Sequence, residues 1–116
     1  MIIGDATSGI LQSALRGLAE RQRVTADNIA NVQTPNFLAG QTDFESSLRA
    51  AIASGSDAST VMPTVQRNQV EPTNTNGNNV SLDTETVIAT ETGLRYQLAL
   101  RALDSKYSTL RTACRG

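Results

Sequence analysis

The chain has 116 residues, of which 39% are hydrophobic and only 3% aromatic, with neither Trp nor His, so it forms at most one domain and has no dense aromatic core. Its net charge of −1 excludes a whole-chain attraction to nucleic acid or to anionic lipid. A single cysteine, Cys114, excludes an internal disulfide, and a chain without histidine cannot build a cysteine–histidine metal site.

The N-terminus, Met-Ile-Ile-Gly-Asp, lacks the basic region, the long apolar run and the cleavage site of a Sec-type signal peptide. No apolar stretch approaches the length of a membrane-spanning helix. We therefore expect no direct membrane insertion, and a protein of this kind that works outside the inner membrane would need another export route.

A first helix is predicted over residues 8–31, with its start capped by Asp5, Thr7 or Ser8. Alternating +4 and +3 spacing defines a heptad seam, made of Leu11, Leu15, Leu18, Gln22, Thr25, Ile29 and Val32. Gln22 and Thr25 put polar groups in the middle of this seam. Either the helix is a poorly packed surface helix, or these polar groups face a partner or set the register.

Residues 26–37 read Ala-Asp-Asn-Ile-Ala-Asn-Val-Gln-Thr-Pro-Asn-Phe. Pro35 keeps Thr34 out of the α region, so the helix should end before it. Asn36 can take a turn or left-handed conformation. We expect a structural corner in which Ile29 and Phe37 are packed and Asn31 or Asn36 bonds to the turn backbone; alternatively, these asparagines are simply solvated.

Residues 42–53 are amphipathic and predict a short helix, with Phe44, Leu48, Ala51 and Ile52 on its apolar side. Residues 54–79 are dominated by polar residues, Gly and Pro, which predicts a long loop that is mobile in the free monomer. A short β-ribbon through Val61, Val65 and Val70 is the most that Pro63 and Pro72 would allow. Asn76-Gly77 is a turn signal.

A second long helix is predicted over residues 82–113, capped by Ser81. Its seam holds Tyr96, Leu100, Leu103, Tyr107, Leu110 and Cys114, the last as a small core residue, and Leu94 and Leu98 form a second stripe. Acidic residues lie near the helix start and basic residues near its end, which suits the helix dipole. The basic end is read as a solvated face, with a membrane or nucleic-acid patch as the less favoured alternative.

These segments predict a mainly α fold. Two long antiparallel terminal helices form a coiled-coil hairpin, joined by a long polar loop with at most a short β-ribbon, and Met1 and Gly116 meet at one end. The chain is expected to be a single elongated domain over 1–116, with a helix at 8–31, the corner, short helix and loop at 32–80, and a helix at 81–114. Such a hairpin buries little area, so we expect a weakly ordered monomer whose remaining apolar surface is covered by other subunits.

Nothing in the sequence predicts catalysis, a cofactor or a small-molecule substrate. No Gly-x-Ser-x-Gly motif, phosphate-binding glycine loop or metal-ligand spacing is present. Asp83 and Glu85 are close in sequence, but residues i and i+2 point to different faces of a helix. We therefore do not expect an enzyme.

The string from Ala26 to Phe37 resembles the N-terminal signature of the bacterial flagellar axial proteins (rod, hook and hook-associated), roughly Ala-x-Asn-Ile/Leu-Ala-Asn-x-x-Thr-x-Gly-Tyr/Phe. Within the rod proteins it is most similar to the proximal rod proteins of the B type, in which an Asp-Phe pair follows, as Asp43-Phe44 does here. Asn36 replaces the usual Gly and Phe37 the usual Tyr. The resemblance covers residues 8–48 well and 80–113 by pattern.

The resemblance implies a structural subunit of the basal-body proximal rod that self-assembles through its terminal helices into the tubular shaft that transmits motor torque. It implies passage through the flagellar type III export apparatus to the periplasmic rod. The implied partners are copies of itself, other rod subunits, and the membrane-ring and rod-adaptor proteins at the base. Another flagellar rod or hook subunit, or a helical export adaptor or chaperone, stays open as an alternative.

Two sets of residues are expected to carry this function. The assembly signature comprises Asn28, Ile29, Ala30, Asn31, Thr34, Pro35, Phe37, Asp43 and Phe44. The helix-packing set comprises Leu11, Leu15, Leu18, Leu94, Tyr96, Leu98, Leu100, Leu103, Tyr107 and Leu110.

Overall fold

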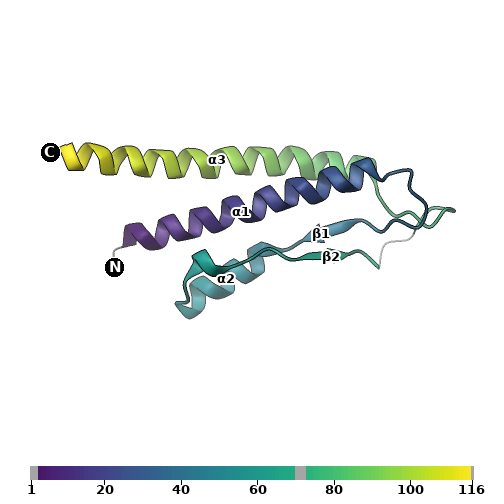
Figure 1. The fold of residues 1–116 in the computed structure, drawn as a ribbon, viewed down its shortest axis with the longest axis horizontal. Coiled ribbons are helices and arrows are strands. Elements are labelled where there is room, and N and C mark those ends of the chain that lie inside the picture. Colours follow the sequence, from purple (N-terminus) through teal and green to yellow (C-terminus); the bar gives the residue numbers. More distant parts are fainter. Residues whose placement is uncertain (1–2, 70–72, 116) are drawn as a thin grey trace.

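The computed structural model describes residues 3–69 and 73–115, and they form a mainly helical fold, as predicted. Helix α1 (Ile3–Ala30) and helix α3 (Leu82–Arg115) lie side by side and antiparallel, so that α1 begins and α3 ends at the same end of the molecule (Figure 1). Met1 and Gly116, which were expected to meet there, lie outside the described residues. Coiled-coil packing of the two helices stays a prediction.

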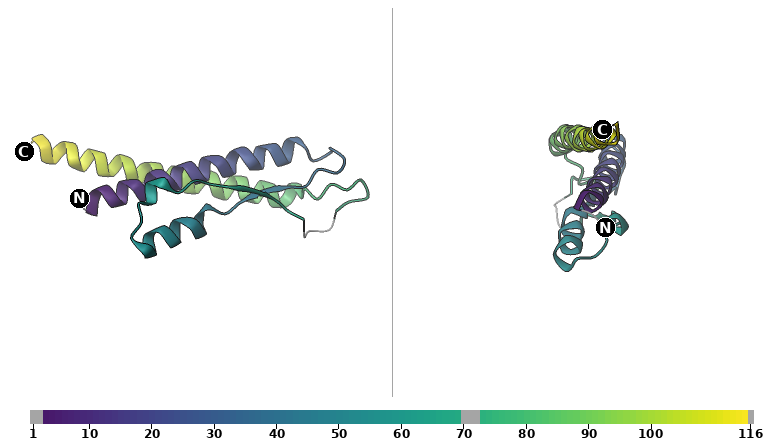
Figure 2. Two further views of the ribbon diagram at one scale, coloured as in Figure 1. Left: turned by 60° about the horizontal axis from the view of Figure 1, so that its bottom comes forward. Right: turned by 90° about the vertical axis from the view of Figure 1, so that its left-hand side faces the viewer.

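The segment between the long helices covers the side of α1 that α3 leaves open. It contains β1 (Gly40–Thr42), α2 (Phe44–Ser54), the 3-10 helix η1 (Ala58–Thr60) and β2 (Val65–Arg67). Helix α1 is therefore central, with α3 on one side and β1, α2 and η1 on the other (Figures 1 and 2). The result is an elongated molecule of 64 × 27 × 14 Å.

Helix α1 begins at Ile3, five residues before the expected start. Asp5, Thr7 and Ser8 therefore all lie inside the helix, and the prediction that one of them caps it was wrong. No proline or competing turn interrupts residues 3–8, so the helix continues through them. It ends at Ala30, where the expected effect of Pro35 is seen: a turn follows, in which the amide of Asn31 still donates to the Asp27 carbonyl at 3.1 Å.

The β-ribbon differs from the expected one in its partner. Strand β2 pairs antiparallel with β1, in the register Gly40 with Arg67, Gln41 with Gln66 and Thr42 with Val65. The polar segment thus pairs with the chain that follows the signature instead of folding on itself, and β2 begins only after Pro63, which cannot donate to a ladder. Val70 and Pro72 lie outside the described residues. The Asn76-Gly77 turn is present, closed by a 2.8 Å bond from the Asn74 amide to the Asn78 carbonyl.

Helix α2 has a cap at each end. The Asp43 side chain accepts a hydrogen bond from the Ser46 amide at 3.2 Å, so the helix begins at Phe44, two residues later than expected. It ends at Ser54, and the C-cap residue Gly55 has a φ of 73°, the left-handed conformation that glycine adopts at little cost. The amide of Ser56 then donates to Ala51 at 2.9 Å, which satisfies a carbonyl of the last turn.

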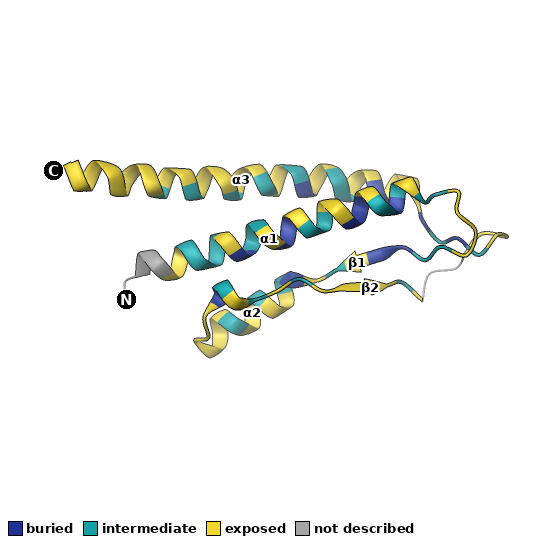
Figure 3. Cartoon of the chain, viewed as in Figure 1, coloured by how far each residue is buried: buried dark blue, intermediate teal, exposed yellow. Residues whose placement is uncertain are grey.

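Helix α3 begins as predicted, with the Thr84 amide donating to the Ser81 hydroxyl at 3.3 Å. Its two buried residues are Glu85 and Thr92, and both are polar. Neither belongs to the expected seam, so the face that α3 turns towards α1 is rotated from that seam. Its second half is exposed along almost its whole length (Figure 3). Cys114 is exposed as well, so its prediction as a core residue was wrong: α3 extends past the part of α1 that could cover it.

The apolar core is small and lies mainly between α1 and the central segment. Among the described residues, the buried apolar ones are Leu18, Val24, Ala39, Phe44, Ala58 and Val80. The buried polar ones are as numerous: Ser13, Thr25, Asn28, Asn78, Glu85 and Thr92. Hydrogen bonding therefore has an unusually large share in positioning the central segment and α3.

Candidate assembly site

Asn28, in the last turn of α1, joins the signature corner to β1. Its side chain is 1% exposed; Nδ2 donates to the Gly40 carbonyl at 2.9 Å, and Oδ1 accepts from the Gly40 amide at 2.8 Å. One carboxamide thus satisfies both backbone groups of Gly40, as a paired strand would. A Cβ at position 40 would lie 3.0 Å from Val24 Cγ1, so glycine allows this close approach.

Two asparagines, Asn31 and Asn36, stabilise the turn after α1. Asn31 donates from Nδ2 to the Asp27 carbonyl at 2.8 Å, and its Oδ1 accepts from the Thr34 hydroxyl at 3.0 Å. Asn36 has a φ of 62°, the left-handed conformation expected of the residue that replaces the family's glycine. Its amide donates to the Asn76 carbonyl at 2.9 Å, which brings the polar segment onto the corner.

The side chain of Asn78 connects the corner to the segment that leads into α3. It is fully buried, and its Nδ2 donates to the carbonyls of Asn31 and Thr34, each at 2.8 Å. Its Oδ1 accepts from the Val80 amide at 2.8 Å. Asn78 thereby gives a second donor to two carbonyls of the turn after α1, which also accept from the amides of Thr34 and Phe37.

The other signature residues of the corner are distributed between surface and interior. Ala30, Thr34 and Pro35 are exposed, whereas Ile29 and Phe37 are half-buried. The Arg67 guanidinium lies over the Phe37 ring at 5.1 Å from its centroid, a cation–π contact between the corner and β2.

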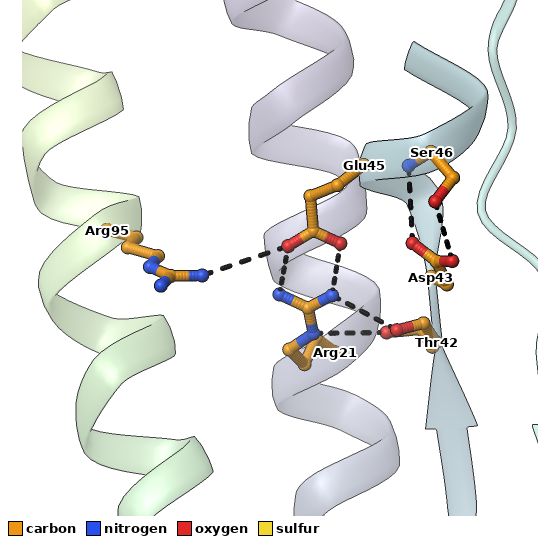
Figure 4. Close-up of polar contacts among 6 residues, drawn as sticks. All are labelled: Arg21, Thr42, Asp43, Glu45, Ser46 and Arg95. Atoms are coloured by element: carbon orange, nitrogen blue, oxygen red, sulfur yellow. Dashed lines mark hydrogen bonds and ion pairs between the residues drawn. The ribbon is translucent and has the colours of Figure 1, made fainter. Parts of the chain in front are cut away.

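Arg21 connects α1 to the Asp-Phe segment (Figure 4). Its guanidinium makes a bidentate pair with Glu45, at 2.7 and 2.5 Å, and also donates to the Thr42 carbonyl at 3.0 Å. The hydrogen bonds from Arg21 lower the pKa of Glu45. Arg95 of α3 lies 3.8 Å from the same carboxylate, so this cluster touches all three helices.

Phe44 is the apolar anchor of the same segment. Its side chain is 4% exposed and lies directly against Gly17 of α1, where any Cβ would overlap the ring. The Arg21 guanidinium covers the ring at 5.0 Å from its centroid. The mid-helix glycine, which costs helix propensity, is thus explained by the room that it makes for Phe44.

A cavity of about 350 Å³ lies between α1, β1 and the first half of α3. Its lining is largely polar and includes Arg21, Thr25, Glu85, Glu91, Thr92 and Arg95. Glu85 is 5% exposed, and its Oε2 has no hydrogen-bond partner in the described part of the chain. Burial raises the pKa of Glu85, and a hydrogen bond from the side-chain amide of Asn28 lowers that pKa by a smaller amount.

The predicted helix-packing residues fall into three groups. Leu18 is buried, and Leu11, Leu15, Tyr96 and Leu103 are half-buried. The remaining members are largely exposed in the subunit: Leu94, Leu98, Leu100, Tyr107 and Leu110. The first two groups stabilise the subunit, and the third is apolar surface without cover.

Sequence reasoning missed Arg21, Asn78 and Glu85. Asn78 belongs to a polar run that composition assigns to a loop, and the turn signal beside it was the one available indication of order. Arg21 and Glu85 look like ordinary solvated charges on amphipathic helices, because nothing local identifies the partner or the burial.

Among residues 3–69 and 73–115, no helix combines the length and apolar character needed to cross a membrane. Within the same described ranges, no group of three or more His, Cys, Asp or Glu side chains is placed to hold a metal ion.

A small core, antiparallel long helices and uncovered leucines define a structural subunit that completes its packing against neighbours. Comparisons with known proteins give the family. Residues 10–37 match the family model described as flagella basal body rod protein. The chain is 32% identical over 121 residues to the flagellar basal body rod protein FlgB of Escherichia coli K12, covering 88% of each chain.

Other relatives agree over nearly the full length. Identity is 32% over 127 residues with FlgB of Aeromonas hydrophila, covering 97% of this chain and 95% of the relative, and 30% over 118 residues with FlgB of Bacillus subtilis, covering 91% of each. The chain belongs to the FlgB family of flagellar basal body rod proteins, and its role is structural and not enzymatic. The expected family is confirmed, in its B type.

Proposed function

We propose that this chain is a subunit of the proximal rod that assembles through its terminal helices, with copies of itself and other rod subunits, into the shaft that transmits motor torque. Residues 1–116 act in it as a single elongated rod-type domain. The observation that carries the proposal is the orientation of α3, which buries Glu85 and Thr92 and presents leucines outward.

The outward leucines of α3 are so exposed that they add little to packing within the isolated subunit. Leu94 is 61% and Leu98 67% exposed, and they lie one turn apart on the same face of α3. Scattered surface leucines need no explanation, but a contiguous stripe on a long helix is typical of an interface. Covering it with neighbouring subunits supplies the apolar burial that the small core lacks.

Placement at the base of the rod adds the membrane-ring and rod-adaptor proteins as neighbours. Delivery through the flagellar type III export apparatus suits a chain that passes unfolded and folds on assembly. The small apolar core supports this route, because little free energy is lost when the subunit unfolds for export.

The test is Leu98→Asp in cells that depend on this chain for motility. A carboxylate buried without a partner costs several kcal/mol at each repeated contact, so the variant should be expressed and exported but absent from purified basal bodies, and swimming should be lost. Ser105→Asp adds the same charge two turns further along the same exposed face and should leave motility intact.

Functional rods containing Leu98→Asp at parental levels would contradict the proposal. Recovery of the parent chain in the cytoplasm, with none in basal bodies, would instead favour an export adaptor or chaperone.

A further inference from the structure

The polar cavity between α1, β1 and the first half of α3 leads from the surface of the subunit to buried polar side chains. Thr25, Glu85 and Thr92 line it and are buried, whereas Gln41 and Glu91 line it and are exposed. Thr25 is one of the two polar residues that interrupt the heptad seam of α1. With a volume of about 350 Å³, the cavity is far larger than a single water molecule needs.

Glu85 is the buried residue of this cavity whose hydrogen bonding is incomplete. A carboxylate offers about four acceptor positions. Asn28 donates one hydrogen bond to Glu85, and its Nδ2 also donates to the Gly40 carbonyl at 2.9 Å, so this amide has no further hydrogen to give. Within residues 3–69 and 73–115, Oε2 of Glu85 has no partner. A charged carboxylate in this position is costly unless a donor reaches it from outside the subunit.

The two arginines that line the cavity are engaged with a different carboxylate, that of Glu45 (Figure 4). Arg21 pairs with Glu45 at 2.7 and 2.5 Å, and Arg95 lies 3.8 Å from the same group. Glu85 and Glu91 form no ion pair within the part of the chain that the structure describes. Three carboxylates and two guanidinium groups give the lining a net charge of −1, which favours a cation over an anion as the occupant.

We propose that this cavity receives an arginine side chain of a neighbouring rod subunit, whose guanidinium pairs with Glu85. The inference rests on the proposed rod function and names one contact within the rod. A guanidinium has five N–H donors in a planar fork, so it can pair with Oε2 of Glu85 and still donate to the hydroxyls of Thr25 and Thr92. The ammonium group of lysine has three donors and is more strongly hydrated, so it suits a buried site less well.

This contact gives a reason for an acidic residue on the inner face of α3. In the isolated subunit, burial makes the charged form of Glu85 costly and raises its pKa. A guanidinium from a neighbour stabilises the charged form and lowers that pKa again. Glu85 therefore contributes to incorporation into the rod, although it weakens the subunit by itself.

Competition for incorporation separates this role from a purely structural one. Cells produce the parent and the Glu85→Gln chain together, and mass spectrometry measures the ratio of the two chains in purified basal bodies and in whole cells. Glutamine keeps the shape of glutamate but not its charge, so the incoming guanidinium stays unpaired. The share of the variant in basal bodies should be about ten-fold lower than in whole cells, although the dilute variant is at least as helical as the parent.

Asp104→Asn is the control for this competition, because it removes a carboxylate from an exposed position of α3 that does not line the cavity. It should be incorporated like the parent. Equal incorporation of Glu85→Gln and the parent would overturn the proposal. Incorporation that falls together with helicity would overturn it as well, because Glu85 would then act only within the subunit.

Photo-cross-linking identifies the arginine. A benzophenone amino acid in place of Gln41, in chains that are present in basal bodies and support swimming, should be joined on irradiation to a rod subunit close to an arginine. Replacing that arginine by glutamine should lower incorporation of the parent by about ten-fold and have no further effect on Glu85→Gln, as expected of a coupled pair.

A cross-link only to a ring or adaptor protein, a cross-linked segment without arginine, or additive effects of the two substitutions would overturn the pairing. In each of these cases the rod function stands and only the contact at Glu85 is wrong. Absence of the parent chain from basal bodies would instead overturn the rod function itself.

Discussion

Glu85 shows how a single residue can weaken the contact between the two long helices. It lies on the inner face of α3 with one carboxylate oxygen unpaired, where an apolar residue would pack better. Because burial raises its pKa, the folded subunit binds a proton at Glu85 more tightly than the unfolded chain does. Its protonated form therefore stabilises the α1–α3 pair relative to its charged form.

The sign of this linkage gives a pH prediction. The stabilisation is complete below the unfolded-state pKa of about 4.3 and is lost as the pH rises through the raised folded-state pKa. Glu85→Gln, which cannot ionise, should therefore stabilise the helix pair by about 1 kcal/mol at neutral pH. The far-UV circular dichroism of the dilute monomer should show more helix for the variant at pH 7, and the difference should vanish in acid.

Comparison with the parent at each pH cancels the acid titration of other groups, such as Glu45, whose pKa is lowered by Arg21. Glu91→Gln removes a carboxylate from an exposed position on the same helix and is the matched control. A Glu85→Gln chain that is less helical than the parent at neutral pH would show that the charged carboxylate stabilises the subunit.

At the scale of elements, α2 docks on α1 through one apolar contact and one ionic cluster. Phe44, the first residue of α2, packs on Gly17, and Glu45 beside it pairs with Arg21. The Asp-Phe pair of the signature thus has two separate roles: Asp43 caps α2, and Phe44 anchors it. The positions of Asp43 and Phe44 depend on the corner, because the hydrogen bonds from Asn28 to Gly40 fix the start of β1 against α1.

Two glycine substitutions separate helix propensity from this docking. Alanine in place of glycine inside a helix ordinarily stabilises it by about 1 kcal/mol. Gly17→Ala should do the opposite, because its Cβ overlaps the Phe44 ring and overpacking costs about 1–3 kcal/mol. Hydrogen–deuterium exchange should show faster exchange in α2 for this variant.

Gly9→Ala is the matched control, since its Cβ would lie 3.5 Å from Ser59 Cβ, an ordinary contact. It should leave exchange in α2 unchanged or slower. Equal protection of α2 in the Gly17→Ala and Gly9→Ala chains would mean that Phe44 does not depend on the glycine.

The whole molecule is more extended than a compact domain of the same length. Its accessible surface is 7658 Å², compared with about 6,100 Å² expected for a compact protein of this mass. Its radius of gyration is 17.6 Å, compared with about 13 Å for a compact domain of this length. The subunit therefore buries less surface on folding than a compact domain of the same size.

We expect the purified monomer to be less helical than its structure, in which the helices span 28, 11 and 34 residues, and to gain helix on assembly. Circular dichroism over a dilution series checks this, with helicity rising with concentration. Full helicity at high dilution, together with a sharp cooperative melt, would contradict the expectation.

Local patterns determined the existence and type of the three α-helices, the turn before Pro35 and the turn at Asn76-Gly77. Heptad spacing, capping residues and proline act over a few residues, so they can be recognised without knowing the fold. The signature from Ala26 to Phe37 likewise identified the family without any coordinates, and the relatives confirm it.

The tertiary structure alone decided which face of α3 meets α1, which side chains hold the corner, and where β2 finds its partner. Heptad spacing describes several apolar stripes equally well, and the choice among them depends on α1 being covered on its other side by the central segment. Asn28 and Asn78 became structural residues because the fold places backbone groups of Gly40, Asn31 and Thr34 within reach. Such contacts join residues far apart in the chain, and no local pattern specifies them.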